Sequence, residues 1–314
     1  MAASDDKRVQ DWLARIGDLR QYAKGGQRSP NKPLLLLYAL GRLHNDGNSR
    51  VPYEHNEARL KEMLNDFGPP RQSGHSPEYA FSRMGGDKIW RLQTADGSTP
   101  AVDSRTALVR TAAVGSLPDD DEQLLKAHPD LFSQTVQQLL RCNWPESFHA
   151  EICQRVGLNL ELLHSQKAEP ANSVGSVQQT RQQRDPEFRP RVLRAYEHQC
   201  AMCGWDARLS QASVGLEAAH IQWKAYEGPD NPNNGISLCV LHHQLFDRGV
   251  LGISADLRVE VSQDFNGRGR SAQLVIELAN QQLIPPQSAE QRPHEQYLDW
   301  HRTQVFKSPA RLPL

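Results

Sequence analysis

The sequence predicts an α+β protein with two domains. The chain has 314 residues, and a typical domain has about 150, so this length suggests two. Helical and strand-like patterns are mixed along the first half. Between residues 167 and 183 the sequence is polar, short of large apolar side chains and without periodicity, which is typical of a linker. We therefore expect a first domain over residues 1–165, a linker over 166–184 and a second domain over 185–314.

Five stretches of the first domain carry apolar residues at the spacing of a helix. They are residues 9–22, 33–46, 56–68, 121–144 and 146–158. Pro33 suits the first turn of its helix, and Gly68 suits the end of the third. Residues 79–84 and 88–93 predict two strands around a Gly-Gly-Asp turn. The second domain should begin with a helix over residues 186–196.

Composition excludes some classes of protein. No apolar run approaches the roughly 18 residues that cross a bilayer, so we expect no membrane partner. The polar residues 1–12 do not form a secretory signal, which predicts a cytoplasmic protein. The net charge is −1, so composition gives no support for nucleic-acid binding, and any DNA contact must come from local patches.

The five cysteines indicate a metal site better than disulfides, because the chain has no export signal. Cys142 and Cys153 stand apart and are interpreted as core residues or inert thiols. The other three form a CxxC and CxxH pattern with a histidine, at Cys200, Cys203, Cys239 and His242. Thiolates and imidazole suit tetrahedral zinc, so we expect a structural Zn²⁺ that adds to folding stability. The alternative is a set of unrelated buried thiols.

Residues 216–247, LEAAHIQWKAYEGPDNPNNGISLCVLHHQLFD, closely resemble the HNH nuclease family. The resemblance covers about residues 186–255 and implies a ββα-metal domain that hydrolyses DNA. The family's His, Asn and His fall on His220, Asn234 and His243. Imidazole can take a proton from water near neutral pH, so His220 is our candidate general base. The resemblance implies that Asn234 positions the base and its loop, although Asn-Gly is also a turn signal.

The resemblance implies that His243 binds a catalytic cation separate from the zinc. Asp247 follows four residues later, so both side chains share one helix face, and its hard oxygen favours Mg²⁺ or Mn²⁺. Asp247 could instead make a local cap or salt bridge. Many family members carry Asp or His just before the base, but Ala219 stands there and cannot bind a metal. We therefore expect phosphate oxygens and water to complete the coordination.

Four stretches resemble phosphorothioate-dependent restriction endonucleases, three of them in the sulfur-binding domain. They are residues 31–43, 64–70, 75–92 and the closing 295–306. The resemblance implies a shallow apolar pocket for the sulfur, which is softer and less hydrated than oxygen, flanked by groups that hold the phosphate. The matching positions are Asn31, Lys32, Tyr79, Ala80, Ser82, Arg83, Arg105 and Thr106. Ala80 replaces a frequent Pro, and Asn31 replaces a residue that can be His.

These resemblances predict a modification-dependent restriction enzyme that binds phosphorothioated double-stranded DNA and cuts nearby. Cutting both strands needs two active sites or two passes, so we expect a homodimer. Two alternatives stay open. The first is an HNH endonuclease for methylated or hydroxymethylated DNA, whose flipped base needs an aromatic cage from residues 79–90. The second is a non-catalytic zinc-knuckle DNA-binding protein, which the missing ligand at Ala219 favours.

Overall fold

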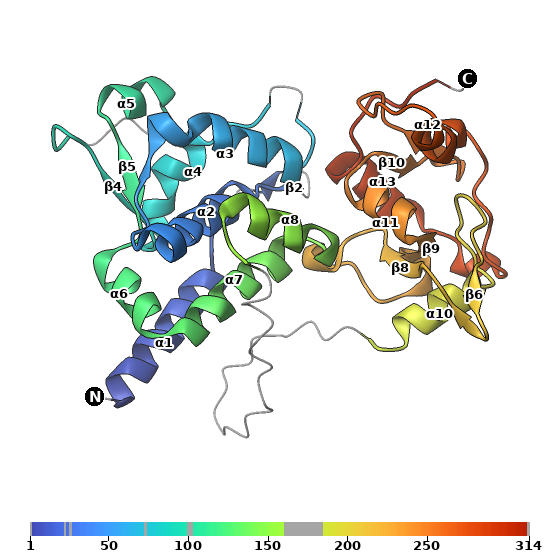
Figure 1. Cartoon of the computed structure of the whole chain (residues 1–314), viewed down its shortest axis with the longest axis horizontal. Helices are drawn as coiled ribbons and strands as arrows, with labels where there is room; N and C mark the ends of the chain where they lie inside the picture. Colours follow the sequence, from blue (N-terminus) through green and yellow to red (C-terminus); the bar gives the residue numbers. More distant parts are fainter. Residues whose placement is uncertain are drawn as a thin grey trace. The chain divides into compact units, whose positions relative to one another are not determined.

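The computed structural model divides the chain into two compact units, residues 1–171 and 172–314 (Figure 1). It describes residues 2–21, 23–24, 27–71, 74–98, 103–159 and 185–312. The predicted linker over 166–184 lies outside the described residues. Both units combine helices with short antiparallel strands, which confirms the predicted α+β class. No helix in the described ranges is both long and apolar enough to cross a membrane.

The first unit is mainly helical. Its helices are α1 (Ala2–Gly17), α2 (Asn31–Asp46), α3 (Tyr53–Phe67), α4 (Glu78–Arg83), α5 (Arg105–Arg110), α6 (Asp119–Ala127), α7 (Pro129–Asn143) and α8 (Glu146–Val156). Its small sheet has the order β3 (Val51–Pro52), β5 (Val114–Ser116), β4 (Arg91–Gln93), and β1 (Ala23–Lys24) pairs with β2 (Gln27–Arg28). The predicted helix over 121–144 is two helices, because a residue before a proline, here His128, is disfavoured in helical geometry.

Helix α2 is the centre of this unit. Every residue from Pro33 to Gly41 is buried, and α2 contacts α3, α4, α7 and α8, as expected for a helix that is apolar on all sides. Gly41 permits the close approach of α8, since a Cβ there would lie 1.8 Å from the carbonyl oxygen of Val156. The helix ends at Gly47, whose φ of 68° is the left-handed conformation that glycine adopts easily.

The predicted strand over residues 79–84 is wrong. These residues form α4 and the start of a 3-10 helix (Met84–Asp87), and only residues 91–93 of the second predicted strand pair in the sheet. A short apolar run does not distinguish strand from helix by its period. Pro77 precedes α4 with a helical φ of −64°, and Glu78 follows in the first turn, where a negative charge is favourable.

The second unit is built around a ββα motif. Strands β8 (Leu216–His220) and β9 (Gly235–Cys239) pair antiparallel in the register Leu216↔Cys239 and His220↔Gly235. Helix α11 (Val240–Asp247) begins directly after β9. The other elements are α10 (Phe188–Ala195), β6 (Arg208–Leu209), β7 (Ala212–Ser213), β10 (Leu251–Ile253), β11 (Val259–Val261), α12 (Arg270–Val275) and α13 (Glu295–Gln304), with further 3-10 turns.

Helices α10 and α11 both pack on the β8–β9 hairpin. Gly235 makes the close approach of α10 possible. A Cβ atom at this position would lie 2.4 Å from a methyl group of Val192 and 3.0 Å from the Phe188 ring, and the first of these distances is a steric clash. The hairpin, α10 and the last turn of α11 share one apolar core with β10, β11 and α13. This core fixes β8 and the end of α11, the elements that carry most of the predicted site residues.

Candidate metal centre and active site

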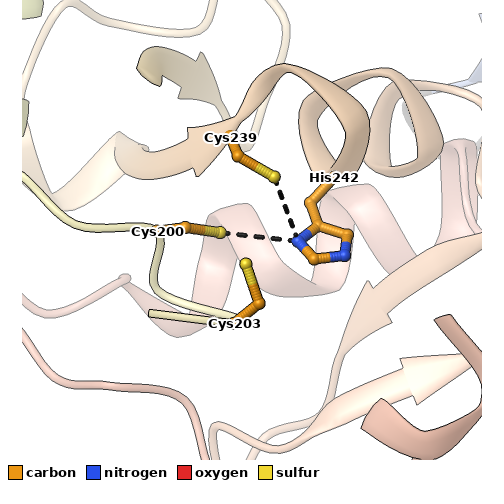
Figure 2. A group of neighbouring side chains, drawn as sticks. All are labelled: Cys200, Cys203, Cys239 and His242. Carbon is orange, nitrogen blue, oxygen red and sulfur yellow. Dashed lines mark hydrogen bonds between the residues drawn. The ribbon is translucent and has the colours of Figure 1, made fainter. Parts of the chain in front are cut away.

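The predicted zinc ligands lie together in the second unit (Figure 2). Cys200 and Cys203 lie on the turn after α10, Cys239 ends β9, and His242 is in the first turn of α11. One ligand atom from each side chain lies within 4.8 Å of the other three. The Nδ1 atom of His242 is 3.5 Å from the Cys200 sulfur and 3.4 Å from that of Cys239.

The donor set of this cluster suits a divalent metal. The other ring nitrogen of His242, Nε2, lies 2.9 Å from the Leu274 carbonyl, an outer contact that turns Nδ1 inward. Hydrogen bonds from the Cys203 and Cys239 thiols strongly lower the pKa of Cys200 despite its burial. Burial alone would lower the pKa of His242, but contacts with the Cys200 and Cys239 sulfurs raise it to about 10. Sulfurs that share protons in this way bind a metal by releasing them.

His220 is the last residue of β8, and its side chain is linked through Asp230 to Lys224. Its Nε2 lies 2.8 Å from Oδ1 of Asp230, and Oδ2 of the same carboxylate is 2.6 Å from the Lys224 ammonium. The imidazole stacks on the Phe188 ring, with centroids 4.0 Å apart and planes 15° apart. Burial would raise the pKa of Asp230, but the hydrogen bonds from Lys224, the Asp185 amide and His220 outweigh it and hold the pKa below its ordinary value. His220 therefore faces an ionised carboxylate.

Asn234 is fully buried and closes the loop that joins β8 to β9. Its side-chain oxygen accepts from the Gln222 amide at 2.8 Å, and its Nδ2 donates to the carbonyls of Gln222 and Pro229, both at 3.0 Å. Gly228 allows the backbone of this loop to pass close to Gln222, since a Cβ at position 228 would lie 1.8 Å from the Gln222 carbonyl oxygen. The contacts of Asn234 thus hold the loop that carries Asp230 to His220.

His243 lies between two carboxylates. Its Nδ1 is 2.6 Å from Oε2 of Glu217 on β8, and its Nε2 is 3.3 Å from Oδ2 of Asp247, one turn further along α11. The hydrogen bond with His243 lowers the pKa of Glu217 in spite of partial burial. Ala219 is fully buried, and its methyl side chain has no atom that can bind a cation.

Two carboxylates that contact the predicted histidines were not predicted from the sequence, those of Glu217 and Asp230. A signal exists for Glu217, because it lies two residues before Ala219 and successive odd positions of a strand share a face. No comparable signal exists for Asp230, whose position depends on the path of a loop. Glu217 and His220 are three residues apart on β8, or about 10 Å along the strand, so the two clusters belong to neighbouring positions of one hairpin.

The predicted DNA-binding residues of the first unit lie along α4 and at the starts of α2 and α5. Asn31 donates from Nδ2 to the Ser76 carbonyl, just before α4, at 3.1 Å. Its buried Oδ1 makes no hydrogen bond with any described residue. The Lys32 ammonium lies 2.5 Å from Oδ2 of Asp87, in the 3-10 turn after α4. These contacts join the start of α2 to both ends of α4.

On α4, Tyr79 is 45% exposed, whereas Ala80 is buried. The half-buried Ser82 has a hydroxyl oxygen without a hydrogen-bond partner among the described residues. Thr106, at the start of α5, is exposed. The structure therefore places Tyr79 and Thr106 at the surface and Ala80 beneath it.

The two predicted arginines are exposed and each contacts an acidic side chain. Arg83 forms a two-pronged ion pair with Asp103, which lies just before α5. Arg105 lies 2.5 Å from the Glu57 carboxylate on α3, which raises its pKa. The Arg83 contact links α4 to the start of α5, so the eight predicted residues occupy one connected region of the unit.

Two family models match separate parts of the chain. Residues 9–161 match the family model of the ScoMcrA-like DNA sulfur-binding domain. Residues 200–254 match the family model of the HNH endonuclease, over the knuckle and the ββα motif. The chain thus joins a ScoMcrA-like DNA sulfur-binding domain to an HNH endonuclease domain. No curated protein matches the chain.

Several solved structures are similar to parts of this endonuclease. The sulfur-binding domain of ScoMcrA complexed with phosphorothioated DNA is 22% identical, covering 48% of this chain and 96% of that chain, with a TM-score of 0.41. The corresponding SprMcrA complex is 20% identical, covering 50% and 98%, with a TM-score of 0.42. The modification-dependent TagI restriction endonuclease is 24% identical, covering 38% and 37%, with a TM-score of 0.28.

Proposed function

We propose that the protein is a modification-dependent restriction endonuclease that binds phosphorothioated double-stranded DNA and hydrolyses phosphodiester bonds near the modification. The observation that carries this proposal is the joining of two domains in one chain, a sulfur-binding domain over residues 9–161 and an HNH domain over 200–254. The contacts of His220, Asn234 and His243, the three residues of the HNH pattern, support the roles proposed for them.

His220 is proposed as the general base. When its Nε2–H donates to Asp230, the basic lone pair of the imidazole is on Nδ1, where it can take a proton from the attacking water. The ionised Asp230 then stabilises the imidazolium that forms. Lys224 balances the charge of Asp230 in the ground state, and stacking on Phe188 fixes the plane of the ring. Asn234 acts on the base indirectly, by holding its loop.

Two metal ions with separate tasks are proposed. Zn²⁺ would be held by Cys200, Cys203, Cys239 and His242, where four protein ligands complete a tetrahedral site and leave no position for substrate. Mg²⁺ or Mn²⁺ would be held by His243 with a neighbouring carboxylate, and such a cation supplies charge that stabilises the leaving oxygen.

The first unit is proposed to read the modification. The exposed ring of Tyr79 offers an apolar contact that favours sulfur, because sulfur is desolvated more cheaply than oxygen. Arg83 and Arg105 would exchange their acidic partners for DNA phosphates, assisted by Lys32 and Thr106. Ala80 is buried and would support the Tyr79 surface from beneath.

Two buried polar atoms in the same region are also consistent with a bound ligand. The Oδ1 atom of Asn31 and the hydroxyl of Ser82 lack partners among the described residues, and buried polar groups in that state usually contact water or a ligand. Since the duplex has two strands and each chain has one HNH site, we also propose that the enzyme acts as a homodimer.

The structure gives less support to a reader of methylated bases. Such a reader stacks a flipped base between exposed aromatic rings. Of the three aromatic residues between positions 79 and 90, Phe81 and Trp90 are buried and pack edge to face, with centroids 5.5 Å apart. Tyr79 is the exposed one.

One digestion experiment tests the proposed function. A duplex with a single Rp phosphorothioate and the same duplex without it are incubated with the zinc-loaded protein in Mg²⁺ and in Mn²⁺. We expect cleavage of the modified duplex alone. Equal affinity for the two duplexes would contradict the assignment of the reader. His220→Ala should abolish cleavage and leave binding intact, whereas His294→Asn, at an exposed histidine that caps α13, should cut normally.

A further inference from the structure

Only one of the two carboxylates beside His243 can share a cation with it. An imidazole that binds a metal through one ring nitrogen usually donates its other N–H to an acceptor, often a carboxylate, which fixes the ring. In His243, Nδ1 faces Glu217 at 2.6 Å and Nε2 faces Asp247 at 3.3 Å. The position of the catalytic cation therefore depends on which carboxylate binds it and which one orients the ring.

The exposure of the two carboxylates distinguishes these arrangements. The catalytic cation must contact a phosphate of a DNA duplex, so part of its coordination sphere has to face the outside. The side chain of Asp247 is 2% exposed, whereas that of Glu217 is 46% exposed. A cation between Nε2 and Asp247 would be enclosed by protein, and a cation between Nδ1 and Glu217 would be open to a phosphate.

The register of β8 supports the same choice. Glu217 and Ala219 are two residues apart on one strand, so their side chains lie on the same face. The contact with His243 shows that this face is directed towards α11. The ligand that the chain lacks at Ala219 can thus come from Glu217, because the longer side chain of glutamate compensates for its more distant position.

We propose that Glu217 and Nδ1 of His243 hold the catalytic cation, and that Asp247 orients His243 by accepting its Nε2–H. This inference rests on the proposed function and refines it. The ionised Glu217 supplies the hard oxygen that Mg²⁺ and Mn²⁺ prefer, and water and a phosphate oxygen fill the remaining positions. Asp247 is then a positioning residue, whose effect on the cation passes through the imidazole.

Cation binding can be measured without cleavage. Free Mn²⁺ is followed by electron paramagnetic resonance during titration of the zinc-loaded full-length protein. We expect one Mn²⁺ site in the wild type, a loss of affinity of more than 100-fold in Glu217→Gln and a smaller loss in Asp247→Asn. Glu290→Gln, at an exposed glutamate outside the motif, is the matched control and should bind as the wild type does. Zinc content and thermal unfolding identify any variant that fails to fold.

A thiolate introduced at each carboxylate position gives a spectroscopic test of direct contact. Co²⁺ is added to the zinc-loaded Glu217→Cys and Asp247→Cys variants. The zinc-loaded wild type, treated in the same way, shows the absorption that arises when Co²⁺ replaces Zn²⁺ at the zinc knuckle. A thiolate bound to Co²⁺ absorbs in the near ultraviolet, and we expect this band in Glu217→Cys alone. The band in Asp247→Cys alone, or stronger Mn²⁺ binding by Glu217→Gln than by Asp247→Asn, would overturn the assignment.

The two proposals fail in different ways. A wild-type protein that binds no ion besides zinc would contradict the cation-dependent cleavage of the proposed function. A wild-type protein that binds Mn²⁺ and cuts modified DNA, with Mn²⁺ affinity unchanged in Glu217→Gln, would contradict only the role of Glu217.

Discussion

Replacement of Asp230 by asparagine tests the electrostatic part of the proposed mechanism. The substitution keeps the size of the side chain and removes the charge that contacts His220 at 2.8 Å and Lys224 at 2.6 Å. A hydrogen bond to a charged group contributes about 1.5–3 kcal/mol. If this contribution is gained as the imidazolium forms, its loss lowers the cleavage rate roughly 10- to 150-fold, since about 1.4 kcal/mol corresponds to a factor of ten.

Single-turnover cleavage of a singly phosphorothioated duplex, measured against pH, is the appropriate assay. Lys224 and the other donors hold the pKa of Asp230 below its ordinary value, so Asp230 stays ionised above about pH 5. The fall of the cleavage rate at acidic pH, the acid limb of the profile, then reports protonation of the proposed base. Removing the carboxylate disfavours the protonated imidazole, which moves this limb to lower pH in Asp230→Asn.

The control for this experiment is Asp185→Asn. Its carboxylate pairs with Arg191 at 2.5 Å in the same cluster but is not the group that contacts His220. We expect its rate to stay within about threefold of the wild type, well inside one factor of ten. A rate for Asp230→Asn that is also within threefold, with the acid limb in its original place, would refute the role of Asp230.

Three further results follow from the structure. Tyr79→Ala should weaken binding to the phosphorothioated duplex by about tenfold and leave binding to plain duplex unchanged, as a filter or fluorescence titration would show. His301 is buried and stacked on Phe246, and burial lowers its pKa to about 3, so the unfolded state binds the proton more readily below about pH 6.5. Stability should therefore fall by about 1.6 kcal/mol between pH 6.5 and 5, and His301→Asn should flatten that slope in urea titrations. Chelation of zinc should lower the calorimetric unfolding temperature of the second unit and not that of the first, and an equal effect on both would contradict a structural role.

The cluster of three cysteines and one histidine could be predicted because its spacing is local. Cys200 and Cys203 share one turn, and Cys239 and His242 share another, so two short patterns contain the whole donor set. The candidate base His220, the loop asparagine Asn234 and His243 were predicted from a family pattern of the same kind. Burial of the long apolar run over residues 33–41 was equally direct, since it leaves no polar face.

The parts that sequence reasoning missed depend on contacts between distant residues. Residues 79–84 were predicted as a strand because their short apolar pattern fits either structure, and the packing of Phe81 against Tyr53 and Trp90 accompanies the helix. Asp230 contacts His220 across a loop that Asn234 holds with its hydrogen bonds. A sequence pattern shows only how far apart residues lie along the chain. The packing of Phe81 and the contact of Asp230 with His220 depend on how distant segments fold together, so no fixed spacing predicts them.

The adjacent histidines of α11 link folding to chemistry. Neighbouring residues of a helix point about 100° apart, so His242 can enter the knuckle while His243 turns towards Glu217. The first turn of α11 is thereby fixed from both sides, by the knuckle at Cys239 and by β8 at Glu217. A zinc ion bound by His242 would hold the first turn of α11, and with it the backbone position of the adjacent His243. Under the proposed function, zinc would therefore act on cleavage without contacting DNA, by keeping His243 close to the carboxylate that is proposed to complete the cation site.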